Sequence, residues 1–163
     1  MSLNQIKLNS HLLTDLYHDV LIQSHSTTSV PESGPLKYLG KNNKHIALLI
    51  DNASLPYLPD NELTFLTNIL SACKLSLADV AIVNIHSIPL NRMEESLHTI
   101  ESNIFILFGM DPLAIDLPIN FPQFQIQRFN GKTYLFSPTL QELEADKALK
   151  LKLWNCLKTL FGI

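Results

Sequence analysis

Polar side chains that could do chemistry follow the apolar runs of this chain. The runs are residues 45–51, 80–85 and 103–109, and the polar residues at or after their ends are Asp51, Asn52, Ser54, His86 and Asp111. If the runs are parallel strands, their carboxyl ends meet at one edge of a sheet, where α/β proteins bind ligands. These five residues therefore form a candidate strand-edge pocket.

The chemistry open to these residues is limited by what lies beside them. Asp51 and Asp111 could pair as general acid and base or hold a metal. Alternatively, Asp51 caps its loop by accepting backbone N–H groups, and Asp111 starts a turn. His86 lacks a third orienting group that the sequence identifies, and the loop after residue 51 has neither a dinucleotide-binding glycine pattern nor a P-loop lysine. We expect no catalytic residue, no metal and no cofactor.

The elements that must position these residues follow from hydrophobic spacing. The three unbroken apolar runs are typical of buried strands, and helical spacing over residues 59–74 and 92–101 predicts crossover helices between them. Such an alternation predicts an α/β domain with a parallel sheet covered on both faces. Only two cysteines occur, Cys73 and Cys156, and both fall inside helical patterns, which disfavours a disulfide scaffold or a zinc site.

The last third of the chain carries turn and cap signals. Asn130-Gly131 between strand-like runs predicts a hairpin, and a looser turn with only residues 133–136 in the sheet is the alternative. Ser137 is a good N-cap, and Thr139 with Glu142 has capping-box spacing. After a break at residues 145–146, a helix runs to residue 161. Its Trp154 and Phe161 lie beside the buried stripe, as core packing or as a partner-binding anchor.

The first 44 residues read as a separate segment. Residues 4–22 have the spacing of an amphipathic helix, with an apolar side that includes Leu13, Leu16, Tyr17 and Val20. Residues 24–43 have linker composition, so we divide the chain into a helix and linker, 1–44, and an α/β domain, 45–163. The helix either packs on its own domain or offers a partner a helix-in-groove contact. Its histidines at positions 11, 18 and 25 lie too far apart to share a metal ion.

Charge and hydropathy exclude some partners. The net charge is −3, and residues 45–136 alone carry four basic against nine acidic residues. An acidic middle without a Lys/Arg cluster disfavours direct, tight nucleic-acid binding. The apolar runs are shorter than the ~20 residues of a membrane span, and the amino terminus lacks a signal-peptide pattern. We expect a cytoplasmic protein with no membrane contact.

Two blocks of the sequence resemble a known family. The blocks are residues 55–80, with Leu55-Pro56-Tyr57-Leu58-Pro59-Asp60 and Leu75-Ser76-Leu77-Ala78-Asp79-Val80, and residues 137–154, from Ser137-Pro138-Thr139 to Leu153-Trp154. In order and spacing they are similar to the psi subunit of bacterial DNA polymerase III. The resemblance implies an α/β/α sandwich of three layers, related to the uracil-DNA glycosylase fold, with a mainly parallel sheet of about four or five strands.

The resemblance also implies a function. The psi subunit is a non-catalytic adaptor that joins the tau/gamma subunit of the clamp loader to the chi subunit, and family members use a segment ahead of the α/β domain for the clamp loader. A divergent glycosylase is an alternative, since Asp51-Asn52 could supply its carboxylate or amide. However, Phe136-Ser137-Pro138 places Phe where that chemistry needs a histidine. An α/β domain that binds a small ligand or nucleotide at the strand edge is the remaining alternative.

Overall fold

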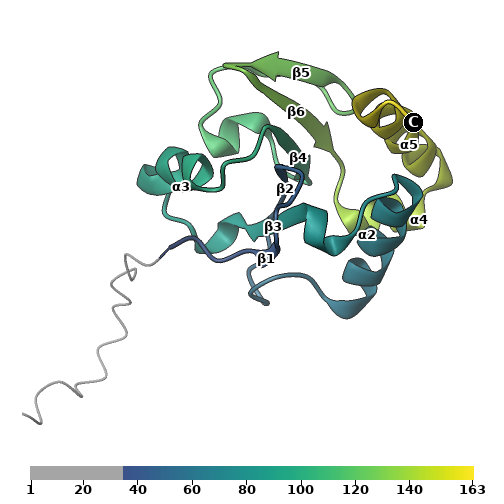
Figure 1. Cartoon of the computed structure of the whole chain (residues 1–163), viewed down its shortest axis with the longest axis horizontal. Helices are drawn as coiled ribbons and strands as arrows, with labels where there is room; N and C mark the ends of the chain where they lie inside the picture. Colours follow the sequence, from purple (N-terminus) through teal and green to yellow (C-terminus); the bar gives the residue numbers. More distant parts are fainter. Residues whose placement is uncertain (1–34) are drawn as a thin grey trace, which may run out of the picture. The chain divides into compact units, whose positions relative to one another are not determined.

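The apolar runs form the middle of a six-stranded sheet in the computed structural model, which describes residues 35–163 (Figure 1). Within these residues the strands are β1 (Leu39–Gly40), β2 (Ile46–Ile50), β3 (Val80–Asn84), β4 (Ile104–Phe108), β5 (Ile126–Phe129) and β6 (Lys132–Ser137). Their order across the sheet is β1-β3-β2-β4-β6-β5. The amphipathic helix predicted over residues 4–22, with Leu13, Leu16, Tyr17 and Val20, lies outside the described residues.

The sheet is mixed, which corrects the prediction of a mainly parallel sheet with fewer strands. The inner strands β3, β2, β4 and β6 are parallel to one another. The unbroken apolar runs predicted this for β2, β3 and β4, whereas the parallel pairing of β6 with β4 was not predicted. Both edges are antiparallel, because β1 pairs with β3 and β5 pairs with β6. The β5–β6 hairpin confirms the Asn-Gly prediction: Asn130 and Gly131 have φ values of 48° and 74°, the left-handed region that this turn requires.

Helices cover both faces of the sheet. Within the described residues they are α2 (Asp60–Ala72), α3 (Met93–Thr99), α4 (Leu140–Ala145) and α5 (Lys147–Phe161). Figure 1 shows α2, α4 and α5 on one side of the sheet and α3 on the other. Alternate strand residues supply the two cores, so that Leu48 and Ile82 pack under α2 and α5, while Leu49 and Val83 pack toward α3.

Of the two caps predicted near residue 137, the one at Thr139 is confirmed and the one at Ser137 is wrong. Thr139 is the N-cap of α4 and forms a capping box with Glu142, as its spacing predicted. Ser137 is not a cap, because it is the last residue of β6 and pairs with Phe108 of β4. The predicted break is confirmed, since Asp146 caps α5 by accepting N–H groups from Ala148 and Leu149.

Residues ahead of position 45 contribute to the sheet and its core. Asn42 is 8% exposed, and its side-chain amide donates to the Ile100 carbonyl at 2.6 Å and accepts from Ser102 Oγ at 3.1 Å. Its backbone N–H donates to the Val80 carbonyl at 3.0 Å. The folded unit therefore includes residues 36–44. Among the helices that the structure describes, none is long and apolar enough to cross a membrane.

Candidate functional site

The parallel strands bring the predicted polar residues to one edge of the sheet. Strands β2 and β3 run in register from Ile46 opposite Val80 to Ile50 opposite Asn84, so the residues that follow them are neighbours. Asp51 follows β2 directly, and His86 lies in the short 3-10 helix η4 (Ile85–Ser87) after β3. Their proximity was predicted from the topology, and the structure confirms it.

Asp51 and His86 form the ionisable pair of this edge. Nδ1 of His86 lies 2.8 Å from Oδ1 of Asp51, and the two side chains are 52% and 53% exposed. A carboxylate hydrogen-bonded at Nδ1 orients the imidazole and leaves Nε2 as the ring nitrogen that can contact a ligand. A pair this exposed stabilises the fold by at most about 1 kcal/mol. The alternative interpretation, that Asp51 accepts backbone N–H groups, is wrong. Among the described residues no backbone N–H donates to Asp51.

Asn52 performs that capping role. Its Oδ1 accepts the backbone N–H groups of Ser54 at 2.9 Å and Leu55 at 3.0 Å. Such a side-chain-to-backbone contact holds a tight turn without glycine. Ser54 contributes its backbone to this turn, and its side chain makes no hydrogen bond within residues 35–163.

Asn84 was not predicted, and it ties the two loops together. It is 6% exposed, and its Oδ1 accepts the backbone N–H groups of Asn52 at 3.0 Å and His86 at 3.1 Å. Its Nδ2 donates to the carbonyls of Asn52 at 2.8 Å and Leu55 at 2.9 Å. An amide at the end of the otherwise apolar run V-A-I-V-N was the signal available in the sequence. Asn84 fixes the backbone from which Asp51 and His86 project.

Asp111 has a structural role. Its Oδ1 accepts the backbone N–H of Leu113 at 2.9 Å and so caps the 3-10 helix η6 (Pro112–Ile115). This confirms the interpretation that Asp111 starts a turn. Within residues 35–163, no hydrogen bond or ion pair joins it to Asp51 or His86, and no cluster of three metal-ligating side chains occurs.

A small hollow adjoins Asp51 and Asn52 between the end of β2 and the start of α4. Its volume is about 50 Å³, and Glu62 and Thr139 also line it. That is room for one or two water molecules, at about 30 Å³ each. Glu62 is 7% exposed and accepts a hydrogen bond from Gln141 Nε2 at 2.8 Å. Nothing in the sequence marked Glu62, because it reads as an ordinary acid in the first turn of a helix.

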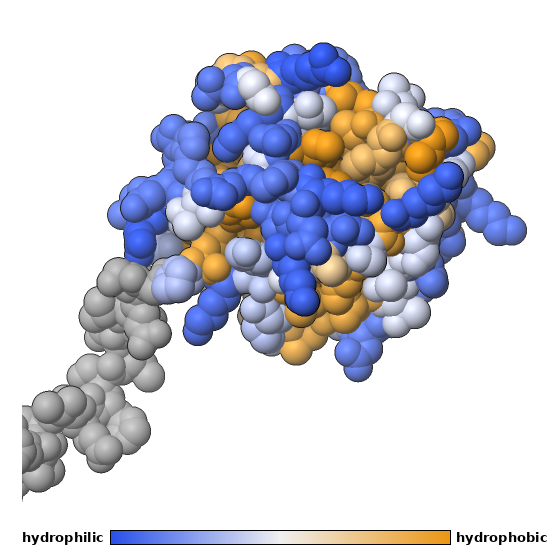
Figure 2. Space-filling model, in the orientation of Figure 1, coloured by the Kyte–Doolittle hydropathy of each residue, from blue (hydrophilic) through white to orange (hydrophobic). Residues whose placement is uncertain are grey.

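A second candidate surface lies between α2 and α5. A groove of about 250 Å³ runs between these helices, and Trp154 lines it. Phe161, the other predicted anchor, is half-buried against the core and is not among the groove residues. Figure 2 shows hydrophobic residues at the surface on the side of the molecule where α5 lies, with hydrophilic residues around them.

The two surfaces differ in chemistry. The strand edge is polar, with an exposed carboxylate–imidazole pair beside a hollow of water size. The groove is apolar and lies between two helices.

No protein-family model matches the chain, and no curated protein is significantly similar to it.

Proposed function

We propose that this chain is a non-catalytic, protein-binding adaptor related to the psi subunit of DNA polymerase III. The observation that carries the proposal is the placement of the two blocks on which the resemblance rests. Residues 55–80 contain α2, and residues 137–154 contain α4 and the first half of α5. These helices lie on the same face of the sheet (Figure 1).

Direct contacts join the two blocks. Gln141 of α4 donates to Glu62 of α2 at 2.8 Å, and Lys150 Nζ of α5 lies 5.4 Å from the ring centroid of Phe65. Beneath them, leucines from both blocks share one core cluster with the sheet: Leu66, Leu70, Leu140, Leu143 and Leu153. The two blocks, which residues 81–136 separate in the sequence, thus build one helical surface, and an adaptor requires such an interaction surface.

The finer fold assignment belongs to the same proposal. Helices on both faces of the sheet are compatible with a three-layer α/β/α sandwich of the uracil-DNA glycosylase type. In this proposal the family's partners carry over: the clamp-loader tau/gamma subunit contacts the amino-terminal residues Leu13, Leu16, Tyr17 and Val20, and a chi-like subunit contacts the α/β domain. Direct, tight binding to nucleic acid is not part of the role.

Size-exclusion co-elution with the tau/gamma subunit of the source organism tests this role. The full chain is compared with Leu16→Glu, which places a charge on the apolar side of the predicted helix, and with His18→Glu on its polar side. We expect the wild type and His18→Glu to co-elute with the subunit and Leu16→Glu to elute alone. If the wild-type chain elutes alone beside a folded subunit, the proposal is wrong.

A divergent base-excision activity is the second candidate, and the Asp51–His86 pair favours it. Asp51 follows the first central strand, where a glycosylase carries its water-activating group. The size of the adjoining hollow counts against this activity, because its volume of about 50 Å³ is far smaller than the roughly 300–1,000 Å³ of a ligand site. Incubation with uracil-containing single-stranded DNA separates the candidates, since uracil release that is lost in Asp51→Asn would establish the enzyme.

A thermal-shift panel of nucleotides, sugars and metal ions tests the small-ligand alternative.

A further inference from the structure

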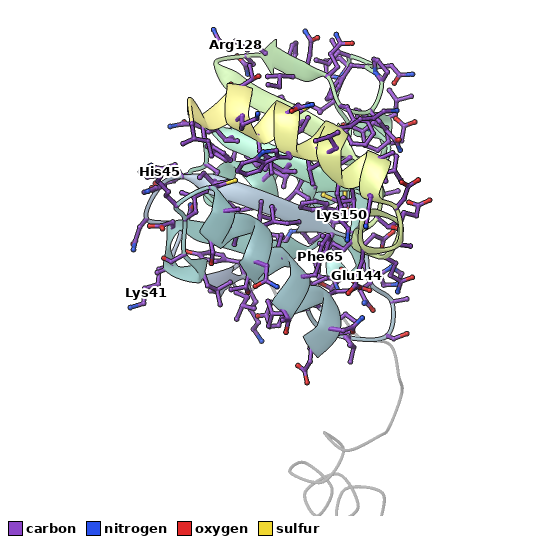
Figure 3. The ribbon with its side chains drawn as sticks, turned by 90° about the vertical axis from the view of Figure 1, so that its right-hand side faces the viewer. Lys41, His45, Phe65, Arg128, Glu144 and Lys150 are labelled. Carbon is purple, nitrogen blue, oxygen red and sulfur yellow. The ribbon has the colours of Figure 1, made fainter. Side chains whose placement is uncertain are left out.

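The groove between α2 and α5 has the lining of a protein-binding site. Apolar side chains and the stem of one lysine form it, together with one amide: Phe65, Asn68, Ile69, Ala72, Lys150, Leu153, Trp154 and Leu157. Figure 3 looks onto this face, where α5 and α2 run side by side and Lys150 and Phe65 lie between them. The 13 residues of α2 and the 15 of α5 give the groove walls about 20 Å of length.

Trp154 gives the groove a side chain suited to anchoring a partner. It is half-buried, so part of its indole lies against the core and part faces the groove. Tryptophan is the residue type most enriched among the side chains that dominate binding energy in interfaces. It is also the only tryptophan of the chain, so its fluorescence reports on this groove alone.

Charge on the groove is one-sided. Helix α5 carries four lysines and no acidic residue, although the whole chain has a net charge of −3. Among residues 35–163 no carboxylate lies within 4.0 Å of Lys150, because the ion pairs there are His86–Asp51 and Arg92–Glu95. The opposite wall is uncharged, since α2 has no ionisable residue after Glu62. A ligand that fits this groove therefore has an apolar stripe and a negative charge on the side of α5.

We propose that the groove binds an amphipathic helix of a protein partner, with leucine-like side chains at helical spacing and carboxylates along the edge that faces α5. The apolar stripe packs on Trp154 and Leu153, and a carboxylate pairs with Lys150, whose ammonium lies over the Phe65 ring and has no carboxylate within 4.0 Å among the described residues. This inference rests on the proposed adaptor role and names the chemistry of a partner contact on the α/β domain.

Two other occupants fit less well. The volume of about 250 Å³ is below the roughly 300–1,000 Å³ of small-molecule sites. Nucleic acid requires a cluster of basic residues on the binding surface, but Lys150 is the one charged residue among those that line the groove.

The probe is a synthetic helical peptide of about 14 residues, matched to the length of the groove. It carries Leu at positions i, i+3, i+7 and i+10 and Glu on the flanks, and a second peptide carries Lys in place of every Glu. Each is titrated into the full chain while Trp154 emission is followed. We expect the acidic peptide to shift the emission to shorter wavelength in a saturable way, and the basic peptide to bind about tenfold or more weakly, because its charges repel Lys150.

A matched pair of variants assigns the effect to Lys150. Lys150→Glu and Lys152→Glu make the same charge change two residues apart on α5, and each removes one lysine–phenylalanine contact. We expect Lys150→Glu to weaken the acidic peptide about tenfold and to strengthen the basic one, whereas Lys152→Glu leaves the affinity for both within about twofold. Circular dichroism melts of both variants check that the fold is retained.

Several results would overturn this inference. The inference is wrong if neither peptide changes the Trp154 emission or if the two peptides bind with equal affinity. It is also wrong if a single-stranded oligonucleotide displaces the acidic peptide. Self-association of the chain that Lys150→Glu abolishes would assign the groove to a second copy instead. A Trp154 response to a synthetic peptide of residues 4–22 alone would assign it to the chain's own segment. None of these results bears on co-elution with the clamp loader, so the two proposals fail separately.

Discussion

Asn84 holds the two loops of the strand edge together. Its four hydrogen bonds join the loop after β2 to the turn after β3, at distances of 2.8–3.1 Å. Asn84→Ala removes the side-chain partner of four backbone groups in part-buried hydrogen bonds, so we expect the free energy of unfolding to fall by about 2–4 kcal/mol. Urea denaturation measures this, with the exposed Asn155→Ala as control. Equal effects of the two variants would contradict the role of Asn84.

Unlike Asn84, the side chains of His86 and Asp51 should contribute little to the free energy of unfolding. Both side chains are about half exposed, so the energy of the contact between them is screened by solvent. We expect His86→Ala to change the free energy of unfolding by less than about 1 kcal/mol in the same urea measurement. A larger loss would mean that the pair is structural. If the loss is small, any loss of a measured activity in this variant reports on function rather than on folding.

At the level of elements, Gly109 sets how closely β4 approaches the start of α4. Its φ is +70°, and a Cβ there would lie 2.3 Å from Cγ2 of Thr139. Gly131 has nearly the same backbone, with φ +74°, but nothing lies within 4 Å of its Cβ position. We therefore expect Gly131→Ala to cost about 1 kcal/mol from the positive φ alone, and Gly109→Ala about 2–4 kcal/mol. Equal losses on denaturation would contradict this close approach.

Asp79, in the short 3-10 helix η3 (Leu77–Asp79), makes the free energy of unfolding depend on pH. Hydrogen bonds from the backbone N–H of Ser76 at 2.7 Å and from its hydroxyl at 3.0 Å lower the pKa of Asp79 below its usual value. Because the folded pKa is depressed, the stabilisation is present above the unfolded pKa of about 3.9 and is lost as the pH falls through the folded value. Asp79→Ala should be destabilising at pH 7, and the difference from wild type should shrink below about pH 4. A difference that is independent of pH would contradict this prediction.

Elements were predictable where a repeating pattern encodes them. Runs such as I-A-L-L-I are buried on both faces of the sheet and are therefore continuously apolar, and Asn130-Gly131 is a turn signal contained in two residues. Strand β1 was missed because it has only two residues, Leu39 and Gly40, and no period to detect. Its antiparallel pairing with β3, like that of β5 with β6, is the reason that the sheet is mixed.

The site was predictable only in part, since its key contacts are tertiary. Parallel strands in register placed Asp51 beside His86, and topology alone could indicate this. Asn84 contacts His86 two residues away, but its bonds to Asn52 and Leu55 span 32 and 29 residues, and the bond between Glu62 and Gln141 spans 79. No local spacing encodes these long-range contacts. Trp154 and Phe161 are seven residues apart, but of these two only Trp154 lines the groove.

For the whole molecule, an adaptor needs two separate contacts. One is predicted for residues 4–22, whose apolar side includes Leu16, and the other is the groove between α2 and α5. The two segments differ in charge, because α5 carries four lysines and no acidic residue, whereas residues 4–22 carry one lysine and two aspartates. This difference supports different partners for the two contacts. We therefore expect Lys150→Glu to leave clamp-loader binding unchanged while it weakens the acidic peptide.

Calorimetric titration of the clamp-loader tau/gamma subunit into the full chain tests the adaptor role most directly. We predict a saturable heat with one binding site per chain and a negative heat-capacity change, since apolar surface is buried on binding. Leu16→Glu should abolish this heat, and Lys150→Glu and His18→Glu should not change it. The absence of binding heat from wild-type chain and a folded subunit, at every temperature tried, would contradict the adaptor role.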